Sequence, residues 1–217
     1  SNNNGTIQIQ NGHNVTVAAS ITVDQTTIDS GATVTVNSGT TWTINNGTGT
    51  DLTVNGTIAN AGTITTAGTR VFNAGTTYRH TQNGGTIPTF TWNATSTVEV
   101  TGVTNTVPSG LGQTFGNFTW NNTGQSTDLS LAGNLDDLNG DLTLVSTGGG
   151  ASELRLVITS GSDLTLNIDG NLNVQGGNLD LFNSAHGNDM TVNIGGVFNQ
   201  TGGSLTSGNT TSASIIN

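Results

Sequence analysis

The residues whose spacing best suits chemistry are three oxygen-bearing side chains in the segment DLNGD. Asp137, Asn139 and Asp141 stand at alternate positions, as oxygen ligands do at the start of a calcium-binding loop. The later Glu that completes an EF-hand loop is missing at the matching position. A turn flanked by the core residues Leu138 and Leu142 explains the same pattern without a metal. We therefore predict no cofactor, and calcium at these three residues is the alternative.

Aromatic residues gather between residues 76 and 122, in a section that also holds both prolines. Tyr78, Trp92 and Trp120 are the candidates for a platform on which a sugar ring stacks, because aromatic side chains combine a large apolar face with a polar edge. The competing interpretation, which we favour, places these rings inside a wider coil or in a loop excursion against the main fold. The section 76–122 is expected to be irregular.

The charged residues do not suggest a catalytic site. Enzymes that cleave polysaccharides on a β-helix use clustered carboxylates, often with Lys or Arg, on neighbouring coils. The sequence contains no Lys, and Arg70, Arg79 and Arg155 are far apart. The adjacent acids Asp136 and Asp137 would point to opposite faces of a strand. We predict that the protein is not an enzyme.

The composition excludes several classes of partner. The chain has 217 residues, 32 Gly, no Cys and a formal net charge of −10. A chain this acidic lacks the basic surface that nucleic acid requires. It has no basic amphipathic helix and no apolar run of membrane-spanning length, so we expect no membrane insertion. Thr, Val, Ile and Leu recur in short alternating runs, which indicates a folded β-structure rather than disorder.

The C-terminal third contains a gap-free internal repeat. The segment DLTLNIDGNLNVQGGNLDL from Asp163 matches DMTVNIGGVFNQTGGSLT from Asp189 at an offset of 26 residues. Each copy has three short runs of alternating apolar and polar residues, separated by Gly-containing turns, which predicts three strands. A unit this small cannot bury its own inward face and must stack on neighbouring copies. The matching apolar pairs are Leu164 and Met190, Leu166 and Val192, Ile168 and Ile194, Leu172 and Phe198, and Leu179 and Leu205.

These features predict an all-β fold: a right-handed parallel β-helix (β-solenoid) with about three short strands per coil and essentially no α-helix. Upstream, Gly140–Leu144 resembles Gly170–Val174, and Glu153–Leu156 resembles Asn178–Leu181. Residues 1–217 are expected to form a single solenoid, either complete or a piece of a longer repetitive protein. A sandwich and an up-and-down barrel also consist of short alternating strands, but the gap-free repeat argues against both.

Several phrases of the sequence resemble the repeats of surface proteins from Bacteroidetes-type bacteria. Examples are LGQTFGNFTWNN from Leu111, LAGNL from Leu131 and GATVTVNSG from Gly31. Such proteins repeat phrases similar to GNLTVNN and GTLTVNSG, are often exported by type IX secretion, and form surface or adhesin-like material. Filamentous-haemagglutinin and autotransporter passenger domains use similar phrases. The resemblance implies a secreted or cell-surface location, which the lack of cysteine also fits.

The last residues, SASIIN, align near the same 26-residue offset with the segment that begins at Asp189. A further coil therefore begins here. Stacked coils expose unpaired strand edges at both ends of a solenoid, and such edges pair with other chains. Ile7, Ile9, Ile215 and Ile216 are the candidate residues for end-to-end self-association.

Together, these patterns favour an extracellular structural protein, such as a surface stalk, matrix component or filament subunit, that stacks through the ends of its solenoid. The expected partners are other copies of the repeat. The alternative function is a carbohydrate-binding adhesin domain that uses the aromatic section 76–122 and has surface polysaccharide as its partner.

Overall fold

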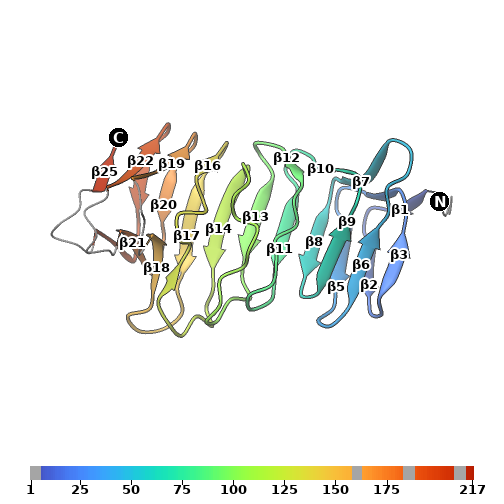
Figure 1. Cartoon of the computed structure of the whole chain (residues 1–217), viewed down its shortest axis with the longest axis horizontal. Helices are drawn as coiled ribbons and strands as arrows, with labels where there is room; N and C mark the ends of the chain where they lie inside the picture. The colour runs from blue at the N-terminus through green and yellow to red at the C-terminus, as the bar shows by residue number, and fades with distance from the viewer. Residues whose placement is uncertain (1–5, 158–162, 183–188, 208–213) are drawn as a thin grey trace.

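The chain forms a parallel β-solenoid in a computed structural model that describes residues 6–157, 163–182, 189–207 and 214–217. These residues contain twenty-five strands and no helix. The strands stack along one long axis, with the two termini at opposite ends (Figure 1). Neighbouring strands pair in parallel, from β1 with β4 near the N-terminus to β22 with β25 near the C-terminus. The predicted all-β solenoid is confirmed.

Each coil visits three faces in the same order. Face 1 holds β1 (Ile7–Ile9), β4 (Thr26–Ile28), β7 (Thr50–Val54), β10 (Thr69–Phe72) and β12 (Thr91–Trp92), then β16 (Asp137–Leu138), β19 (Leu164–Ile168), β22 (Met190–Ile194) and β25 (Ser214–Ile216). Face 2 is one sheet of β2 (Asn14–Val17), β5 (Thr33–Val36), β8 (Thr57–Asn60), β11 (Thr77–His80), β13 (Thr97–Val100), β14 (Asn117–Asn121), β17 (Leu142–Ser146), β20 (Leu172–Val174) and β23 (Phe198–Gln200). Face 3 holds β3 (Ile21–Val23), β6 (Thr41–Ile44) and β9 (Thr63–Thr66), then β15 (Leu129–Ser130), β18 (Glu153–Val157), β21 (Asn178–Phe182) and β24 (Ser204–Thr206).

Face 2 is the continuous face, whereas faces 1 and 3 are interrupted in the middle. The nine strands of face 2 are all hydrogen-bonded in order. On face 1 the sheet stops at β12, and the next contact is an isolated bridge from Phe115 to Leu138. On face 3 it stops at β9, and an isolated bridge joins Thr86 to Ser109 before β15. Nine layers about 4.8 Å apart make a rod roughly 40 Å long.

The 26-residue repeat is confirmed residue by residue. All five apolar pairs that match in the two copies are register partners of stacked strands. The looser upstream resemblances are confirmed as well, since Leu142 pairs with Leu172 and Leu154 pairs with Leu179. The last strand, β25, begins a further coil as expected, although Ser214 is 24 residues from its partner Met190.

The length of a coil changes along the rod, but the section 76–122 is more regular than predicted. On face 2 the register advances by 19 residues in the first step, by 20 through the aromatic section and by 30 before the C-terminal repeat. The expected irregularity is therefore confined to faces 1 and 3. The register pairs that show these steps are Val15 with Val34, Tyr78 with Val98, Val98 with Phe118, and Leu142 with Leu172.

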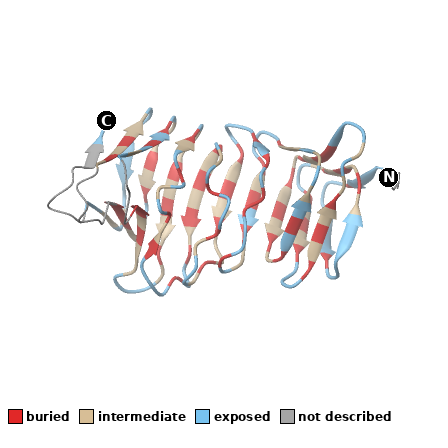
Figure 2. Cartoon of the chain, viewed as in Figure 1, coloured by how far each residue is buried: buried red, intermediate tan, exposed pale blue. Residues whose placement is uncertain are grey.

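The core follows from the two-residue period of the strands. Successive side chains of a strand point to opposite sides, so Val34 and Val36 are buried while Thr33 and Thr35 lie on the outer surface. Figure 2 shows this alternation of buried and partly exposed residues along the strands. Burying each aliphatic side chain stabilises the fold by about 1.5–3 kcal/mol. The outward Thr residues are β-branched and favour the extended backbone.

Glycine is required where one turn stacks tightly on the turn below. A Cβ at Gly116 would lie 2.3 Å from the carbonyl oxygen of Asn93 and 2.4 Å from that of Ser96. Gly177, in the turn between β20 and β21, has a φ of +72°, which only glycine adopts without strain. These turns let the backbones of adjacent coils approach closely enough to keep the sheets in register.

Candidate functional site

The aromatic section packs inside the solenoid. Tyr78 and Trp120 are 0% exposed and Trp92 is 7% exposed. The ring centroid of Phe72 lies 4.9 Å from that of Phe90 and 4.6 Å from that of Trp92. The prediction that Tyr78, Trp92 and Trp120 form a sugar-binding platform is wrong, because a sugar ring cannot stack on side chains that are buried in the core. The competing core interpretation is correct.

Two polar residues of face 2 point into the same core. Asn60 donates a hydrogen bond from Nδ2 to the Tyr78 hydroxyl at 2.9 Å. His80 stands next along this inward column, and its Nε2 lies 2.7 Å from the carbonyl oxygen of Gly84. The other ring nitrogen, Nδ1, is buried without a hydrogen-bond partner. Burial raises the pKa of Tyr78 and lowers the pKa of His80, because the interior disfavours the charged form of each.

The side chain of Gln113 bridges the interruption of face 1. Its Oε1 accepts hydrogen bonds from the Trp92 indole at 2.9 Å and from the Phe90 backbone at 3.3 Å. Its Nε2 donates to the carbonyl oxygen of Gly110 at 2.6 Å. A side-chain amide has two donors and an accepting oxygen, so it supplies the hydrogen bonds that a missing strand would have made.

Gln125 has the same role close to face 3. Its Oε1 accepts a hydrogen bond from the Trp120 indole at 3.0 Å, and its Nε2 donates to the carbonyl oxygens of Thr127 at 2.9 Å and Glu153 at 2.8 Å. The residue is 3% exposed. Sequence analysis missed both glutamines, since a lone Gln in a polar sequence carries no signal until its neighbours in other coils are known.

Two of the three calcium candidates accept hydrogen bonds from other parts of the fold. Asp137 Oδ2 accepts a hydrogen bond from the Thr114 hydroxyl at 2.9 Å. Asp141 Oδ1 accepts the backbone N–H of Asn171 at 2.7 Å, which fixes the turn of the next coil. Asn139 lies exposed on the surface. Within the part of the chain that the structure describes, no three His, Cys, Asp or Glu residues come together to hold a metal. Calcium at these positions stays the alternative to the prediction of no cofactor.

Of the three shortest ion pairs among the described residues, two join neighbouring coils. Arg79 Nε lies 2.7 Å from Glu99, its register partner on the next strand. Arg155 lies 2.6 Å from Asp128 of the preceding coil and 2.8 Å from Glu153 of its own strand. Exposed ion pairs of this kind contribute about 0–1 kcal/mol each. The two pairs that join neighbouring coils help to keep those coils aligned along the rod.

A ladder of asparagines follows the outer surface of face 1 near the C-terminus. Asn193 donates from Nδ2 to Asn167 Oδ1 at 2.9 Å, and Asn217 donates to Asn193 Oδ1 at 2.9 Å. The ladder lines a shallow polar groove of about 450 Å³ together with Asp137 and Asp169. The 26-residue repeat places Asn167 and Asn193 in register, so the sequence contained this signal.

The N-terminal end of the solenoid is an open apolar mouth. A hollow of about 350 Å³ is lined by inward side chains of the first two coils. Val15 is 41% exposed and Ile21 is 48% exposed, although both stand at core positions of their strands. Ile7 is also exposed, whereas Ile9 is buried. Ile7 is therefore the accessible residue of the predicted N-terminal pair.

The mouth also contains a buried hydroxyl without a partner. Thr26 of β4 is 2% exposed and lines the hollow. Its Oγ1 makes no hydrogen bond. The residue beside it on β1 is Ile7, its register partner, which has no polar side-chain atom to offer. An unsatisfied buried hydroxyl is unfavourable, and this one lies at an open end of the fold.

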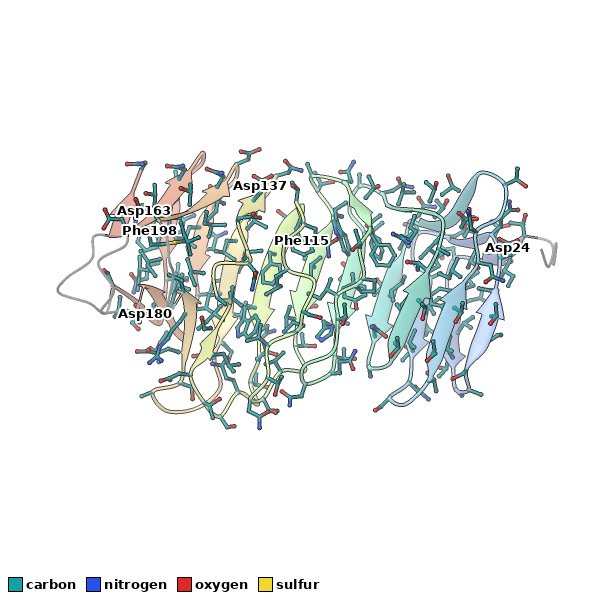
Figure 3. All side chains as sticks on the ribbon, in the orientation of Figure 1. Asp24, Phe115, Asp137, Asp163, Asp180 and Phe198 are labelled. Atoms are coloured by element: carbon teal, nitrogen blue, oxygen red, sulfur yellow. The ribbon has the colours of Figure 1, made fainter. Side chains whose placement is uncertain are left out.

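The C-terminal end is also apolar. Phe198 of β23 is 40% exposed and Ile216 of β25 is 43% exposed, and Val197 beside them is exposed as well. Figure 3 shows Phe198 at the end of the rod opposite Asp24. Ile215 belongs to β25, but its side chain lies outside the described residues. Among the described residues, β1 and β25 are the terminal strands of face 1, and these apolar side chains at core positions are exposed.

No protein-family model, curated protein or solved structure matches this chain. The described residues contain no helix of the length and hydrophobicity needed to cross a membrane.

Proposed function

We propose that this chain is a structural segment of an extracellular protein, a rod that stacks end to end through its terminal coils. The observation that carries the proposal is the contrast between the ends and the sides of the solenoid. The lateral surface of the rod presents Thr, Asn and paired charges. The N-terminal end exposes Val15 and Ile21, and the C-terminal end exposes Phe198 and Ile216. Exposed apolar patches beside open strand edges are typical of association surfaces.

The composition supports the extracellular part of this proposal. The chain has no Cys and only 7% charged residues, and its repeated phrases resemble those of bacterial surface proteins. A non-catalytic role is consistent with charges that pair between coils, as Arg79 does with Glu99. In this proposal, the chain belongs to a surface stalk, a matrix component or a filament subunit.

The experiment is sedimentation velocity over a range of protein concentrations, with electron microscopy of the associated fraction. We expect rods longer than one solenoid, joined at their ends. Phe198→Asp should abolish the association, because it places a charge in the apolar end. The matched control is Asn199→Asp, the neighbouring residue of the same strand, which points outward and should associate as the unmodified chain does. A chain that stays monomeric at every concentration would contradict the proposal.

A second candidate function is glycan binding on the asparagine ladder. The groove lined by Asn167, Asn193 and Asp137 offers amide and carboxylate groups in a row, and such groups suit the hydroxyls of a linear polysaccharide. A glycan array tests this candidate, with Asn193→Ala as the variant that should lose binding. An array without hits on the unmodified chain would remove it.

A further inference from the structure

Asn46 and Gly47 lie at the corner where β6 of face 3 leads into β7 of face 1. They form one of six Asn-Gly pairs in the chain. In such a pair the backbone nitrogen of the glycine can attack the side-chain carbonyl carbon of the asparagine, because glycine has no side chain to hinder the approach. The attack is slow unless a base removes the proton of the attacking N–H. The group that faces each glycine N–H therefore decides which pair reacts.

The N–H of Gly47 donates to a buried carboxylate. Its nitrogen lies 2.5 Å from Asp51 Oδ1, and Asp51 is 0% exposed. The second oxygen, Oδ2, accepts the backbone N–H of Thr69 on the next coil at 2.7 Å. These two bonds fix the carboxylate, and a general base must lie within hydrogen-bond distance of the proton that it takes.

The same carboxylate lies beside the side-chain amide of Asn46. A Cβ placed on Gly68 would be 1.7 Å from Asp51 Oδ2 and 3.1 Å from Asn46 Oδ1. Both side chains therefore border the space above Gly68. Asp51 is in contact with the attacking N–H and is next to the amide group that must release its nitrogen.

The backbone around Gly47 is held by the preceding coil. The Gln25 side-chain amide donates a hydrogen bond to the carbonyl oxygen of Thr48. A Cβ at Gly47 would lie 2.5 Å from Asp24 Oδ1, so a larger residue would collide with Asp24 where it now stands. Asn46 itself is exposed, which gives water access to its side chain. The fold thus holds the nucleophile and the carboxylate together in advance.

We propose that Asn46 is a self-modification site of the folded chain, with Asp51 as the general base. Asp51 takes the proton of the Gly47 N–H while this nitrogen attacks Asn46 Cγ. A bond forms between Gly47 N and Asn46 Cγ, and the bond from Cγ to Nδ2 breaks. The side-chain nitrogen leaves as ammonia with the proton that Asp51 had taken, and the product is a cyclic imide. Water then opens the imide to aspartate or isoaspartate.

This proposal does not depend on the end-to-end association proposed above, since the site lies on the lateral surface of the rod. Two other Asn-Gly pairs have a neutral group in place of the carboxylate. Gly84 donates its N–H to the carbonyl oxygen of Thr106 at 2.8 Å, and Gly140 donates to that of Gly116 at 3.1 Å. Asn139, which precedes Gly140, is exposed as Asn46 is. This pair is therefore the internal reference for the reaction without a base.

The test follows the unmodified chain during incubation at neutral pH, folded in buffer and unfolded in urea. Chymotrypsin cleaves after Trp42 and Leu52, which isolates Asn46 in residues 43–52, and mass spectrometry with fragmentation detects the acid that replaces the amide. We expect Asn46 to convert about tenfold or more faster in the folded chain than in urea. Asn139 should convert no faster when folded. Conversion of Asn46 that is equal or slower in the folded chain would overturn the proposal.

Two variants with the same change of charge identify the base. Asp51→Asn keeps the shape of the side chain and one accepting oxygen, and conversion of Asn46 should fall to about the rate in urea. Asp24→Asn is the control, because Asp24 is buried beside Gly47 but accepts its hydrogen bond from the Gln25 N–H at 3.0 Å. It should leave the rate unchanged. Equal slowing by both variants would show that Asp51 is not the base.

Circular dichroism establishes that each variant is folded before its rate is measured. If Asp51→Asn does not fold, the comparison of the unmodified chain in buffer and in urea decides the proposal by itself.

Discussion

The aromatic middle and the C-terminal repeat build the same coil in different ways. In the repeat, all three faces pair through backbone ladders, and aliphatic residues such as Leu166 and Leu172 fill the core. In the middle, only face 2 keeps a continuous ladder. Large rings and the amides of Gln113 and Gln125 fill the interruptions of the other faces.

The difference shows that each face of a coil must be hydrogen-bonded and packed against the next coil, but that side chains can do this in place of a strand. A backbone ladder distributes its hydrogen bonds over many residues, each with a small net contribution. The middle instead depends on a few side chains, each with several contacts. Single substitutions should therefore be more damaging in the middle than in the repeat, which the following variants test in order of expected effect.

The largest effect is expected for Trp120→Ala. Trp120 is 0% exposed and belongs to the same inward column as Leu144 and Val174. Removing a buried tryptophan costs about 3–5 kcal/mol, whereas Val174→Ala, at equal depth in the repeat, should cost about 2 kcal/mol. Urea unfolding followed by circular dichroism measures both. Equal losses would contradict the comparison.

Gln125→Ala should cause the second-largest loss of stability. It leaves the Trp120 indole N–H and the carbonyl oxygens of Thr127 and Glu153 without their partner. An unsatisfied buried group costs about 1–3 kcal/mol, and of these three bonds only the one to Trp120 is fully buried, so we expect a loss of about 1–3 kcal/mol in the free energy of unfolding. Gln200→Ala is the control, since Gln200 is exposed and should change stability by less than about 0.5 kcal/mol. A similar result for both variants would show that the amide is not a substitute for a strand.

The middle should also be sensitive to acid through His80. Burial lowers the pKa of His80 in the folded chain, while in the unfolded chain it is about 6.5. Below pH 6.5 the unfolded chain therefore binds a proton that the folded chain does not. The contribution is fully present above pH 6.5 and is lost as the pH falls toward the lowered pKa, by up to about 1.4 kcal/mol per pH unit.

The measurement is urea unfolding between pH 7 and pH 5.5, on the unmodified chain and on His80→Leu. We expect the variant to lose most of the slope over this range. The other two histidines, His13 and His186, are present in both chains, so the comparison isolates His80. An unchanged slope would assign the acid sensitivity to other groups.

The smallest effect is expected on the surface of the repeat. Asn193→Ala removes the two ladder hydrogen bonds to Asn167 and Asn217, each 2.9 Å long. Both are solvent-exposed, so the expected loss is about 0.5–1 kcal/mol. Thermal unfolding measures it, with Asn167→Ala as the partner variant at the adjacent rung. A loss as large as that of Gln125→Ala would remove the contrast between the two regions.

Much of the fold follows from local sequence pattern. The two-residue alternation assigns inward and outward side chains, and the 26-residue repeat gives the register of Leu164 on Met190 and Leu172 on Phe198 directly. The 20-residue step of the aromatic section was missed, although Tyr78, Val98 and Phe118 show it on face 2. Here the register partners differ in residue type, so sequence similarity between coils does not reveal the register.

What the sequence determined by itself is the class of fold, the strand register of its regular part and the start of a further coil at β25. Only the tertiary structure decided that Trp92 and Trp120 are core residues, that Gln113 and Gln125 replace strands, and that Thr26 lies partnerless at an open end. The physical reason is distance along the chain. Alternation is a property of adjacent residues, whereas burial, and hydrogen bonds such as that between Trp92 and Gln113, depend on residues about one coil away.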